Sequence, residues 1–265
     1  MKMKEFVMSD TVHVIYTFGG FIITAILIFL AVKFIKDQKK KDFILKLSAI
    51  VTVILHFSIL YVEYFQNGGS AQITLTYLMP AYPCHIAMWL LVIVAFMRDK
   101  KSTAFKTLSE ITFYLGIIGG VFGIVLNEIY ISNPNLADWG VLKGMLSHST
   151  MLYGCIYLLA GGYVKLGVKN MSSVLIGLLL LVADGAVVIG VHYLFGVEPP
   201  NSMYLLESPM ASLPWLNTWM LGISAFLVIF AFNLVYEHLA LNKEERWITS
   251  VSKKVDEYKH AHNKR

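Results

Sequence analysis

Seven long apolar segments dominate this chain of 265 residues and constrain its fold more than any motif does. A helix needs about 20 apolar residues to cross the hydrocarbon core of a bilayer, and each segment meets that length. We expect them at roughly Val14–Phe34, Phe43–Phe65, Leu75–Met97, Thr107–Tyr130, Lys143–Val164, Val174–Phe195 and Trp215–Leu239. With 57% hydrophobic and 15% charged residues, the chain is too apolar to hide them in a soluble core. The prediction is an all-α polytopic membrane protein with seven transmembrane helices.

The connectors between these segments are short and contain residues that end helices. Gln66–Gly69, Ser132–Asn135 and Glu198–Ser202 are examples, each with glycine, proline or asparagine. No soluble domain fits between the spans. We therefore predict a seven-helix domain over residues 1–240 and a basic cytoplasmic tail over residues 241–265.

Lysine and arginine are distributed unevenly between the two sides that these segments define. All but three of the 22 basic residues lie in the first, third and fifth connectors, at their helix ends, or in the tail after Leu239. The exceptions are Lys2, Lys4 and Lys143. Because basic residues near helix ends are retained in the cytoplasm, this bias predicts an N-terminus outside and a cytoplasmic C-terminus. An odd number of crossings agrees with that orientation.

The net charge of +5 does not indicate a nucleic-acid partner. The basic residues flank apolar spans, where anionic headgroups of the lipid bilayer account for them. Cys84 and Cys155 both lie inside apolar segments and are poor candidates for a disulfide framework. The sequence leaves the oligomeric state open and indicates no cofactor.

Ionisable and amide side chains inside the spans are expected to gather in the outer half of the bilayer. An ionisable group in hydrocarbon costs several kcal/mol unless it faces a cavity or a partner, so each is a candidate functional residue. Helical spacing places His56 with Glu63, and Asp184 with His192, on single faces, because residues seven or eight apart share a face. The predicted substrate-binding residues inside the spans are His56, Glu63, Asn127, Asp184 and His192. Pairing that only fixes helix packing is the alternative.

The sharpest local feature is the segment from Pro80 to His85. Its two prolines remove backbone donors near the middle of a span, which predicts a kink just before Cys84. A thiolate is a strong nucleophile and is usually formed by a neighbouring imidazole. His85 follows Cys84 directly, so the two side chains diverge on a helix and the base should come from elsewhere. His148, at similar depth, is the predicted base, and His85 the group that orients substrate or stabilises an oxyanion.

Three elements resemble a known family. They are the run from Tyr82 to Ile86, His148 after Gly144–Leu146, and the run Asn201–Leu205 followed by Pro209, Pro214 and Trp215. Together they resemble the YwaF-like integral membrane proteins of bacteria and their mammalian relative, a multi-pass acyltransferase of ether phospholipids. An alternative alignment to a Pro-x-His-x-Cys pattern keeps His85 but moves the family cysteine to Ala87. The resemblance implies a multi-pass protein of a bacterial plasma membrane.

The same resemblance implies acyl transfer from or to a membrane phospholipid through a thioester. Cys84 would attack an acyl ester, His148 would accept the thiol proton, and the acyl group would pass to an alcohol or to water. The connector from Glu198 to Pro214 is predicted to fold back over the site as a lid, with Asn201 and Tyr204 bonding inward.

Two other classes of function remain open. A metal-dependent intramembrane lipid hydrolase would need closely spaced histidine ligands, and no span has histidines four residues apart, so no metal residue is predicted. A transporter or receptor would use Glu63, Asp184 and the histidines as a polar relay. Trapping an acyl thioester would discriminate between these classes.

Overall fold

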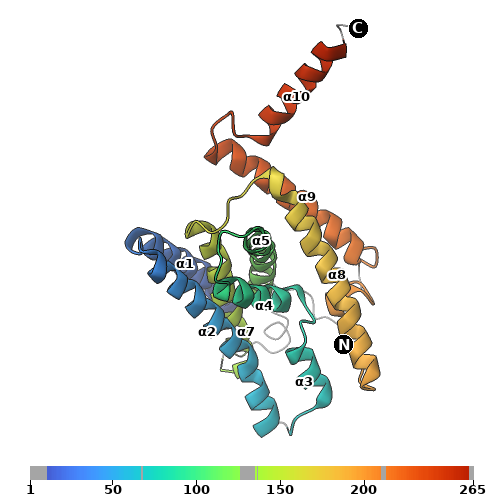
Figure 1. Cartoon of the computed structure of the whole chain (residues 1–265). Coiled ribbons are helices and arrows are strands. Elements are labelled where there is room, and N and C mark those ends of the chain that lie inside the picture. Colours follow the sequence, from blue (N-terminus) through green and yellow to red (C-terminus); the bar gives the residue numbers. More distant parts are fainter. Residues whose placement is uncertain (1–10, 67, 126–134, 136, 210–212, 263–265) are drawn as a thin grey trace.

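The computed structural model describes residues 11–66, 68–125, 135, 137–209 and 213–262, and over these residues the chain is helical without strands. Asn127, one of the predicted substrate-binding residues, lies outside these ranges. The helices are α1 Thr11–Phe34, α2 Gln38–Phe65, α3 Ala71–Leu78, α4 Pro83–Phe96, α5 Thr103–Val125, α7 Trp139–Ala160, α8 Met171–Leu194, α9 Thr218–Ala240 and α10 Trp247–His262, with 3-10 turns η1 Val168–Asn170 and η2 Ser202–Tyr204. The all-α prediction is confirmed for the described part of the chain (Figure 1).

Five helices are long and apolar enough to cross a membrane, namely α1, α2, α5, α9 and α8 together with η1. The pair α3 and α4 adds a sixth candidate, because together they have the length and hydropathy of one span with a bend of 51° between them. α7 has 22 residues but does not reach the hydropathy of the others. The structure therefore gives five to six candidate spans of the predicted seven, and the seventh crossing stays a prediction.

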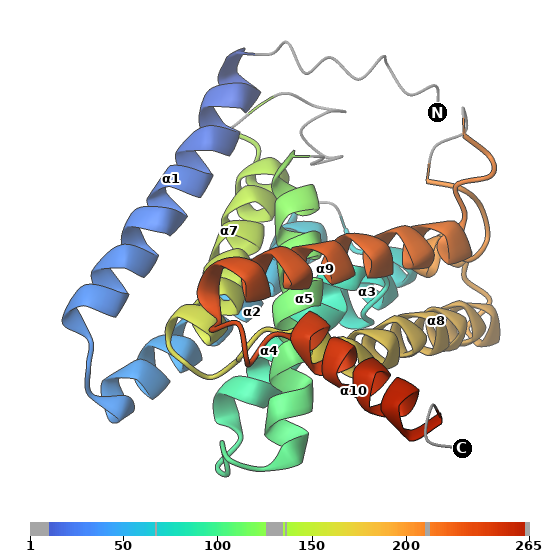
Figure 2. The same ribbon diagram turned by 90° about the horizontal axis from the view of Figure 1, so that it is seen from above.

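α7 is less apolar than the other long helices because it carries polar side chains that face its neighbours. Lys143 and Ser147 are buried, and His148 is half-buried. The helix packs against α1, α2, α4 and α5 and so lies among them (Figure 2). In lipid a polar side chain is tolerated when it faces other helices, so the low hydropathy of α7 agrees with its central place.

Lipid-facing surface is concentrated on the peripheral helices. Of the residues in the most apolar stretch of each helix, 56% are buried in α5 but only 17% in α1 and 11% in α9. Large apolar side chains of α1 and α9 are exposed, among them Phe18, Ile22, Phe29, Trp219, Leu227 and Val228. α1 lies at the edge of the molecule, and α8 and α9 lie together on another side of α5 (Figure 2). The core thus lies between α2, α4, α5 and α7.

Side-chain caps fix where several helices begin. The carboxylate of Asp138 accepts from the backbone N–H of Gly140 at 2.7 Å and begins α7. The amide oxygen of Asn217 accepts two backbone N–H groups at 3.1 Å and begins α9. Such caps satisfy donors that have no partner inside the helix. At the other end of α7, Gly162 takes a φ of 84°, which favours glycine and lets the chain turn away.

A polar cluster joins the helix ends on the side that the charge bias assigns to the cytoplasm. The hydroxyl of Tyr163 donates to Asp42 at 2.6 Å, and the ammonium of Lys100 lies 5.5 Å from the Tyr163 ring centroid. Lys100 also donates at 3.3 Å to the carbonyl oxygens of Val94 and Ala95 at the end of α4. Burial raises the pKa of Tyr163 and lowers that of Lys100. The raised pKa keeps the Tyr163 hydroxyl protonated as a donor.

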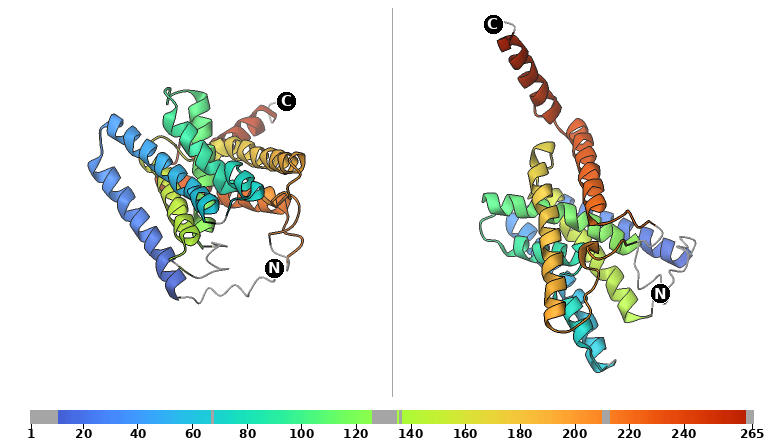
Figure 3. Two further views of the ribbon diagram at one scale, coloured as in Figure 1. Left: turned by 90° about the horizontal axis from the view of Figure 1, so that it is seen from below. Right: turned by 90° about the vertical axis from the view of Figure 1, so that its right-hand side faces the viewer.

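The tail forms a helix that is attached to the rest of the chain mainly at its first residue. Figures 1 and 3 show α10 projecting beyond the other helices. The N–H of Trp247 donates to the buried carboxylate of Glu237 at 2.7 Å, and its ring lies 6.0 Å from that of Phe230. The other oxygen of Glu237 accepts from Val168 at 2.8 Å, so one side chain holds the starts of α10 and η1.

Candidate functional site

A break in the predicted third span places Cys84 and His85 in the first turn of a helix. α3 ends at Leu78, and α4 begins at Pro83 after an extended Tyr82. Proline has no backbone N–H and fits the first helical position, where a donor would be unsatisfied anyway. The predicted kink is confirmed, although it is a complete interruption rather than a bend in a continuous helix. Cys84 is consequently the second residue of α4.

Two glycines of α5 bring the helices that carry Cys84 and His148 close together. A Cβ added at Gly119 would lie 3.0 Å from the Cα atom of Cys84, so α4 approaches α5 backbone to backbone. A Cβ added at Gly123 would overlap the imidazole of His148, whose ring fills the space that a side chain would need. Gly119 and Gly123 are one helical turn apart, or about 6 Å along α5. Cys84 and His148 therefore lie against the same face of α5.

The ring of His148 is oriented by a hydrogen bond within α7. Its Nδ1 lies 2.6 Å from the carbonyl oxygen of Gly144. A carbonyl only accepts, so Nδ1 carries the proton and, in the neutral ring, Nε2 carries the lone pair. Nε2 is among the ring atoms nearest to Gly123. His148 thus presents a basic nitrogen on the α5 side, where Cys84 also lies.

His56 and His85 form a pair of imidazoles next to the break. Their ring centroids are 4.6 Å apart at an interplanar angle of 70°. Nε2 of His56 donates at 3.1 Å to the carbonyl of Tyr77, in the last turn of α3, where helix carbonyls lose their partners. His85 has a buried Nδ1 with no hydrogen-bond partner among the described residues. The other ring nitrogen bonds the Met79 carbonyl, so Nδ1 can accept a hydrogen bond from a substrate hydroxyl.

Lys143 is a member of the site that the sequence analysis did not identify. Its side chain is only 4% exposed, and its ammonium lies 4.6 Å from the ring centroid of Tyr77. It lies within electrostatic range of one thiol and three imidazoles, those of Cys84, His56, His85 and His148. These residues, with Lys143 and Tyr77, are here called the α4 break cluster.

Lys143 was expected to flank a span at the outer surface, because the predicted fifth span began there. α7 begins four residues earlier, at Trp139, behind the cap of Asp138. Asp138 is a typical helix-capping residue, and it was the signal that would have placed Lys143 inside the helix.

The other predicted substrate-binding residues do not all join the α4 break cluster. Glu63 lies within electrostatic range of Tyr77. His192 is fully buried, with Nδ1 2.8 Å from the Val188 carbonyl and Nε2 3.5 Å from the Thr76 hydroxyl. It therefore lies at the edge of the cluster, across α3.

Asp184, on the same helix as His192, is half-buried, and its Oδ2 has no hydrogen-bond partner among the described residues. Asp184 is therefore not assigned to the α4 break cluster.

The connector between α8 and α9 folds back onto the helix break. Ser202 donates through Oγ to the Ala81 carbonyl at 2.8 Å, and the N–H of Met203 reaches the same oxygen at 3.2 Å. Met203 and Tyr204 adopt positive φ values of 50° and 57°, a backbone conformation that is unfavourable outside glycine. The predicted folding back of this connector is found.

The prediction that the Asn201 side chain bonds inward, toward the site, is wrong. Among the described residues, its side chain bonds Leu206 and Glu207, at 2.9–3.2 Å, and so closes the connector on itself. Tyr204 is held by its backbone, because its carbonyl accepts from the Thr218 hydroxyl at 2.6 Å.

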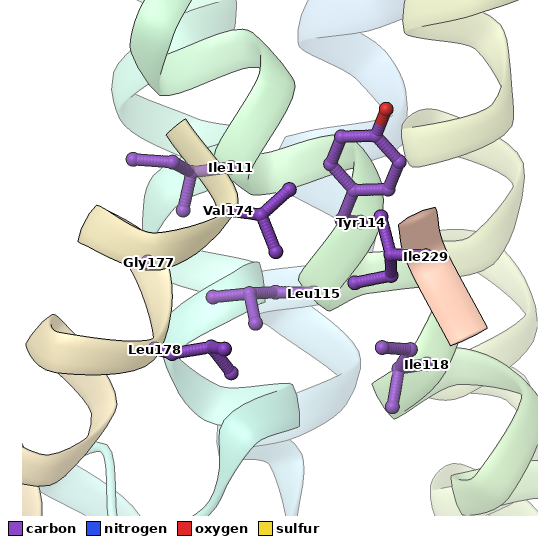
Figure 4. A pocket seen from close by; sticks show the side chains of 8 residues that line it. All are labelled: Ile111, Tyr114, Leu115, Ile118, Val174, Gly177, Leu178 and Ile229. Carbon is purple, nitrogen blue, oxygen red and sulfur yellow. The ribbon is translucent and has the colours of Figure 1, made fainter. Parts of the chain in front are cut away.

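A small pocket lies elsewhere, between α5, α8 and α9 (Figure 4). It is lined by Ile111, Tyr114, Leu115, Ile118, Val174, Gly177, Leu178 and Ile229. No residue of the α4 break cluster lines it. Within the described ranges, no group of three or more histidine, cysteine, aspartate or glutamate side chains is arranged to hold a metal ion.

The fold and the site define a helical, multi-pass membrane protein with a thiol, a lysine and three histidines gathered between its helices. A family model described as the TMEM164 family matches residues 7–236, and the chain belongs to that family, whose members are multi-pass membrane proteins. No curated protein and no solved structure matches the chain. The family match names no reaction, so the acyl transfer implied by the YwaF-like resemblance is taken up as a proposal.

Proposed function

We propose that this protein is a membrane-embedded lipid acyltransferase that carries the acyl group on Cys84 as a thioester, with His148 as the base. One observation carries the proposal. Cys84 and the lone-pair nitrogen of His148 lie against the same face of α5, at Gly119 and Gly123. Nucleophilic catalysis by a thiol requires a base within reach of the sulfur, and the shared face of α5 brings together a thiol from α4 and a base from α7.

The chemistry needs no group beyond these side chains and the lipid. Nε2 of His148 takes the proton of the Cys84 thiol, and the thiolate attacks the carbonyl carbon of an acyl ester. The ester C–O bond breaks, and His148 returns the proton to the departing oxygen, which leaves as a lysolipid alcohol. An acceptor alcohol then gives its proton to His148, attacks the thioester and releases the thiolate.

His85 is suited to orient the acceptor alcohol. Its unpartnered Nδ1 is buried in the same helix turn as the nucleophile. The other ring nitrogen bonds the carbonyl of Met79. In the neutral ring Nδ1 therefore carries the lone pair and can accept a hydrogen bond from the hydroxyl of the acceptor. We assign His56 a positioning role, because its own hydrogen bond to Tyr77 fixes the ring against which His85 packs.

The experiment that tests the proposal traps the acyl-enzyme. The full chain in nanodiscs is incubated with phospholipid that bears an alkyne-tagged acyl chain, and the protein is examined by peptide mass spectrometry with and without hydroxylamine. We expect a hydroxylamine-sensitive acyl group on the peptide that contains Cys84, and none in Cys84→Ala. Cys155→Ala is the matched control, because Cys155 is the only other cysteine and lies buried against Gly116.

Other results would contradict the proposed acyltransferase mechanism. Full lipid turnover in Cys84→Ala would exclude the thioester, and turnover lost only in His148 and His85 variants would indicate hydrolysis by an activated water. Uptake of a solute into proteoliposomes with no turnover of lipid would favour the transporter alternative.

A further inference from the structure

Lys143 is buried at a position where a lysine side chain could reach the membrane surface. Lysine side chains near a membrane surface usually extend along apolar surface and leave the ammonium in water or among headgroups. Lys143 lies in the second turn of α7, close enough to the helix end for that, yet it is turned inward and only 4% exposed. Burying an ammonium costs several kcal/mol unless an anion or a π-face compensates.

The groups within electrostatic range of Lys143, or in contact with it, come from four helices. They are His56 of α2, Tyr77 of α3, Cys84 and His85 of α4, and His148 of α7 itself. On α5, Gly119 lies against Cys84 and Gly123 against His148, and neither glycine carries a charge. Glu63 of α2 lies in electrostatic range of Tyr77. The groups found around Lys143 are thus a thiol, three imidazoles and an aromatic ring.

Only one of these groups is suited to be the anion. Imidazoles are neutral or positive, and Tyr77 presents its ring to the ammonium, which is a cation–π contact. Cys84 is left, and its ionised form attracts Lys143. Cys84 also occupies the second position of the 14-residue helix α4, where the N–H groups of the first turn favour negative charge.

We propose that Lys143 is a positioning residue whose buried ammonium pairs with the Cys84 thiolate and keeps the nucleophile ionised at neutral pH. The proton lost by the thiol resides on Nε2 of His148, and Lys143 stays protonated throughout. The inference deepens the proposed function, since it concerns the same cysteine, but it can be tested without measuring lipid turnover.

Alkylation of Cys84 provides that test, because only the thiolate reacts with N-ethylmaleimide at an appreciable rate. The full chain with Cys155→Ala has Cys84 as its single thiol. Its alkylation rate in nanodiscs is measured by mass spectrometry across pH, with and without Lys143→Gln. An opposite charge nearby lowers a thiol pKa by about one unit or more, so we expect about tenfold slower alkylation of Lys143→Gln at neutral pH. The two rates should converge at high pH, where both thiols are ionised.

Two variants make this result specific. Lys143→Arg keeps the charge and should restore most of the neutral-pH rate. Lys100→Gln removes the same charge at the other end of α4, where Lys100 bonds the Val94 and Ala95 carbonyls, and should leave the Cys84 rate unchanged. Thermal unfolding of each variant verifies that it is folded, and if Lys143→Gln is not, Lys143→Met takes its place.

An unchanged rate in folded Lys143→Gln would overturn the inference, and so would a reduction by the same factor at every pH, which would show altered access only. The proposed function fails separately. If Lys143→Gln shifts the pH profile while Cys84→Ala retains lipid turnover, the ion pair stands and the acyl-enzyme does not. If acyl-Cys84 forms but Lys143→Gln leaves the pH profile of alkylation unaltered, the acyl-enzyme stands and the ion pair does not.

Discussion

At the scale of single residues, His148 is held by two contacts that act on different parts of its ring. Gly144 fixes the proton on Nδ1 through a hydrogen bond of 2.6 Å, and Gly123 provides the space in which the ring lies. A base must be held within about half an ångström of its productive position, so both contacts matter for proton transfer. Neither involves a charged partner that would hold the ring by itself.

The substitution Gly123→Ala tests this arrangement. Alanine forms helices better than glycine by about 1 kcal/mol, so helix propensity alone predicts a stabilised protein. Because the new methyl group would overlap the His148 ring, we expect lower stability and a loss of lipid turnover of about tenfold or more. Gly190→Ala in α8 is the control, since a Cβ there meets nothing within 4 Å. Equal turnover in the two variants, measured beside thermal unfolding, would contradict the role of Gly123.

The pair Cys84 and His148 gives a second test at this scale. Residues that act as one catalytic unit are not additive, because removing either already abolishes the unit. We expect Cys84→Ala, His148→Ala and the double variant to lose similar amounts of turnover, and all three to remain folded and extractable. Additive losses would show that the two side chains act in separate steps.

The sequence predicts the membership of much of this site but not its geometry. Cys84 and His85 were predicted because a thiol and an imidazole are unusual inside an apolar span. The kink before them was predicted because proline cannot donate a backbone hydrogen bond, and the structure has the interruption there. Lys143 was not identified, because a lysine at the end of an apolar run is normally a flanking charge. Its inward direction depends on where α7 begins and on the partners of α2, α3 and α4, which a single sequence does not reveal.

At the scale of elements, the connector between α8 and α9 and the α3–α4 break stabilise each other. The break leaves the carbonyl of Ala81 without a helical donor, and Ser202 and Met203 provide two. In return the connector is anchored against α8, where a Cβ on Gly185 would lie within 3.0 Å of Met203. The connector thus completes hydrogen bonds that the interrupted helix has lost, which matters in lipid because water is absent.

Ser202→Ala should weaken that anchor. The hydroxyl is fully buried, and loss of a buried hydrogen bond costs about 1 kcal/mol. We expect faster protease cleavage within the connector and reduced lipid turnover. Asn201→Ala is the comparison: it removes three bonds inside the connector but none to the break, so it should increase cleavage with a smaller effect on turnover. The reverse order of the effects on turnover would show that local order, and not the anchor, is what matters.

At this scale the sequence predicts the long helices but not the hydrogen bonds of the connectors. The long apolar helices were predicted because lipid demands length and hydropathy, and both are visible in a sequence. Asn201 was expected to bond inward, but an asparagine in a tight connector readily bonds the backbone a few residues away, and Asn201 does so. Which bond an asparagine makes is decided by connector geometry, not by residue type.

At the scale of the whole molecule, the predicted orientation of the chain depends on whether α7 crosses the membrane. If the five apolar helices and the bent pair all cross, they make six crossings and leave both termini on one side. A seventh crossing by α7 would place them on opposite sides. The distribution of basic residues favours seven, because only then do nearly all of the lysines and arginines lie in the cytoplasm. The central place of α7 among α1, α2, α4 and α5 agrees, since a helix surrounded by spans does not need high hydropathy itself.

Protease protection in sealed, right-side-out cells decides between six and seven crossings. With an epitope tag at each end, we expect added protease to remove the N-terminal tag and leave the C-terminal tag, which follows the basic tail after Leu241, intact. Both tags must become sensitive when the cells are permeabilised, which excludes a merely resistant tag. Two protected tags, or two cleaved tags, would mean that α7 does not cross. The α4 break cluster would then lose its predicted place in the outer half of the bilayer, because Lys143 and His148 lie on the helix whose crossing sets that depth.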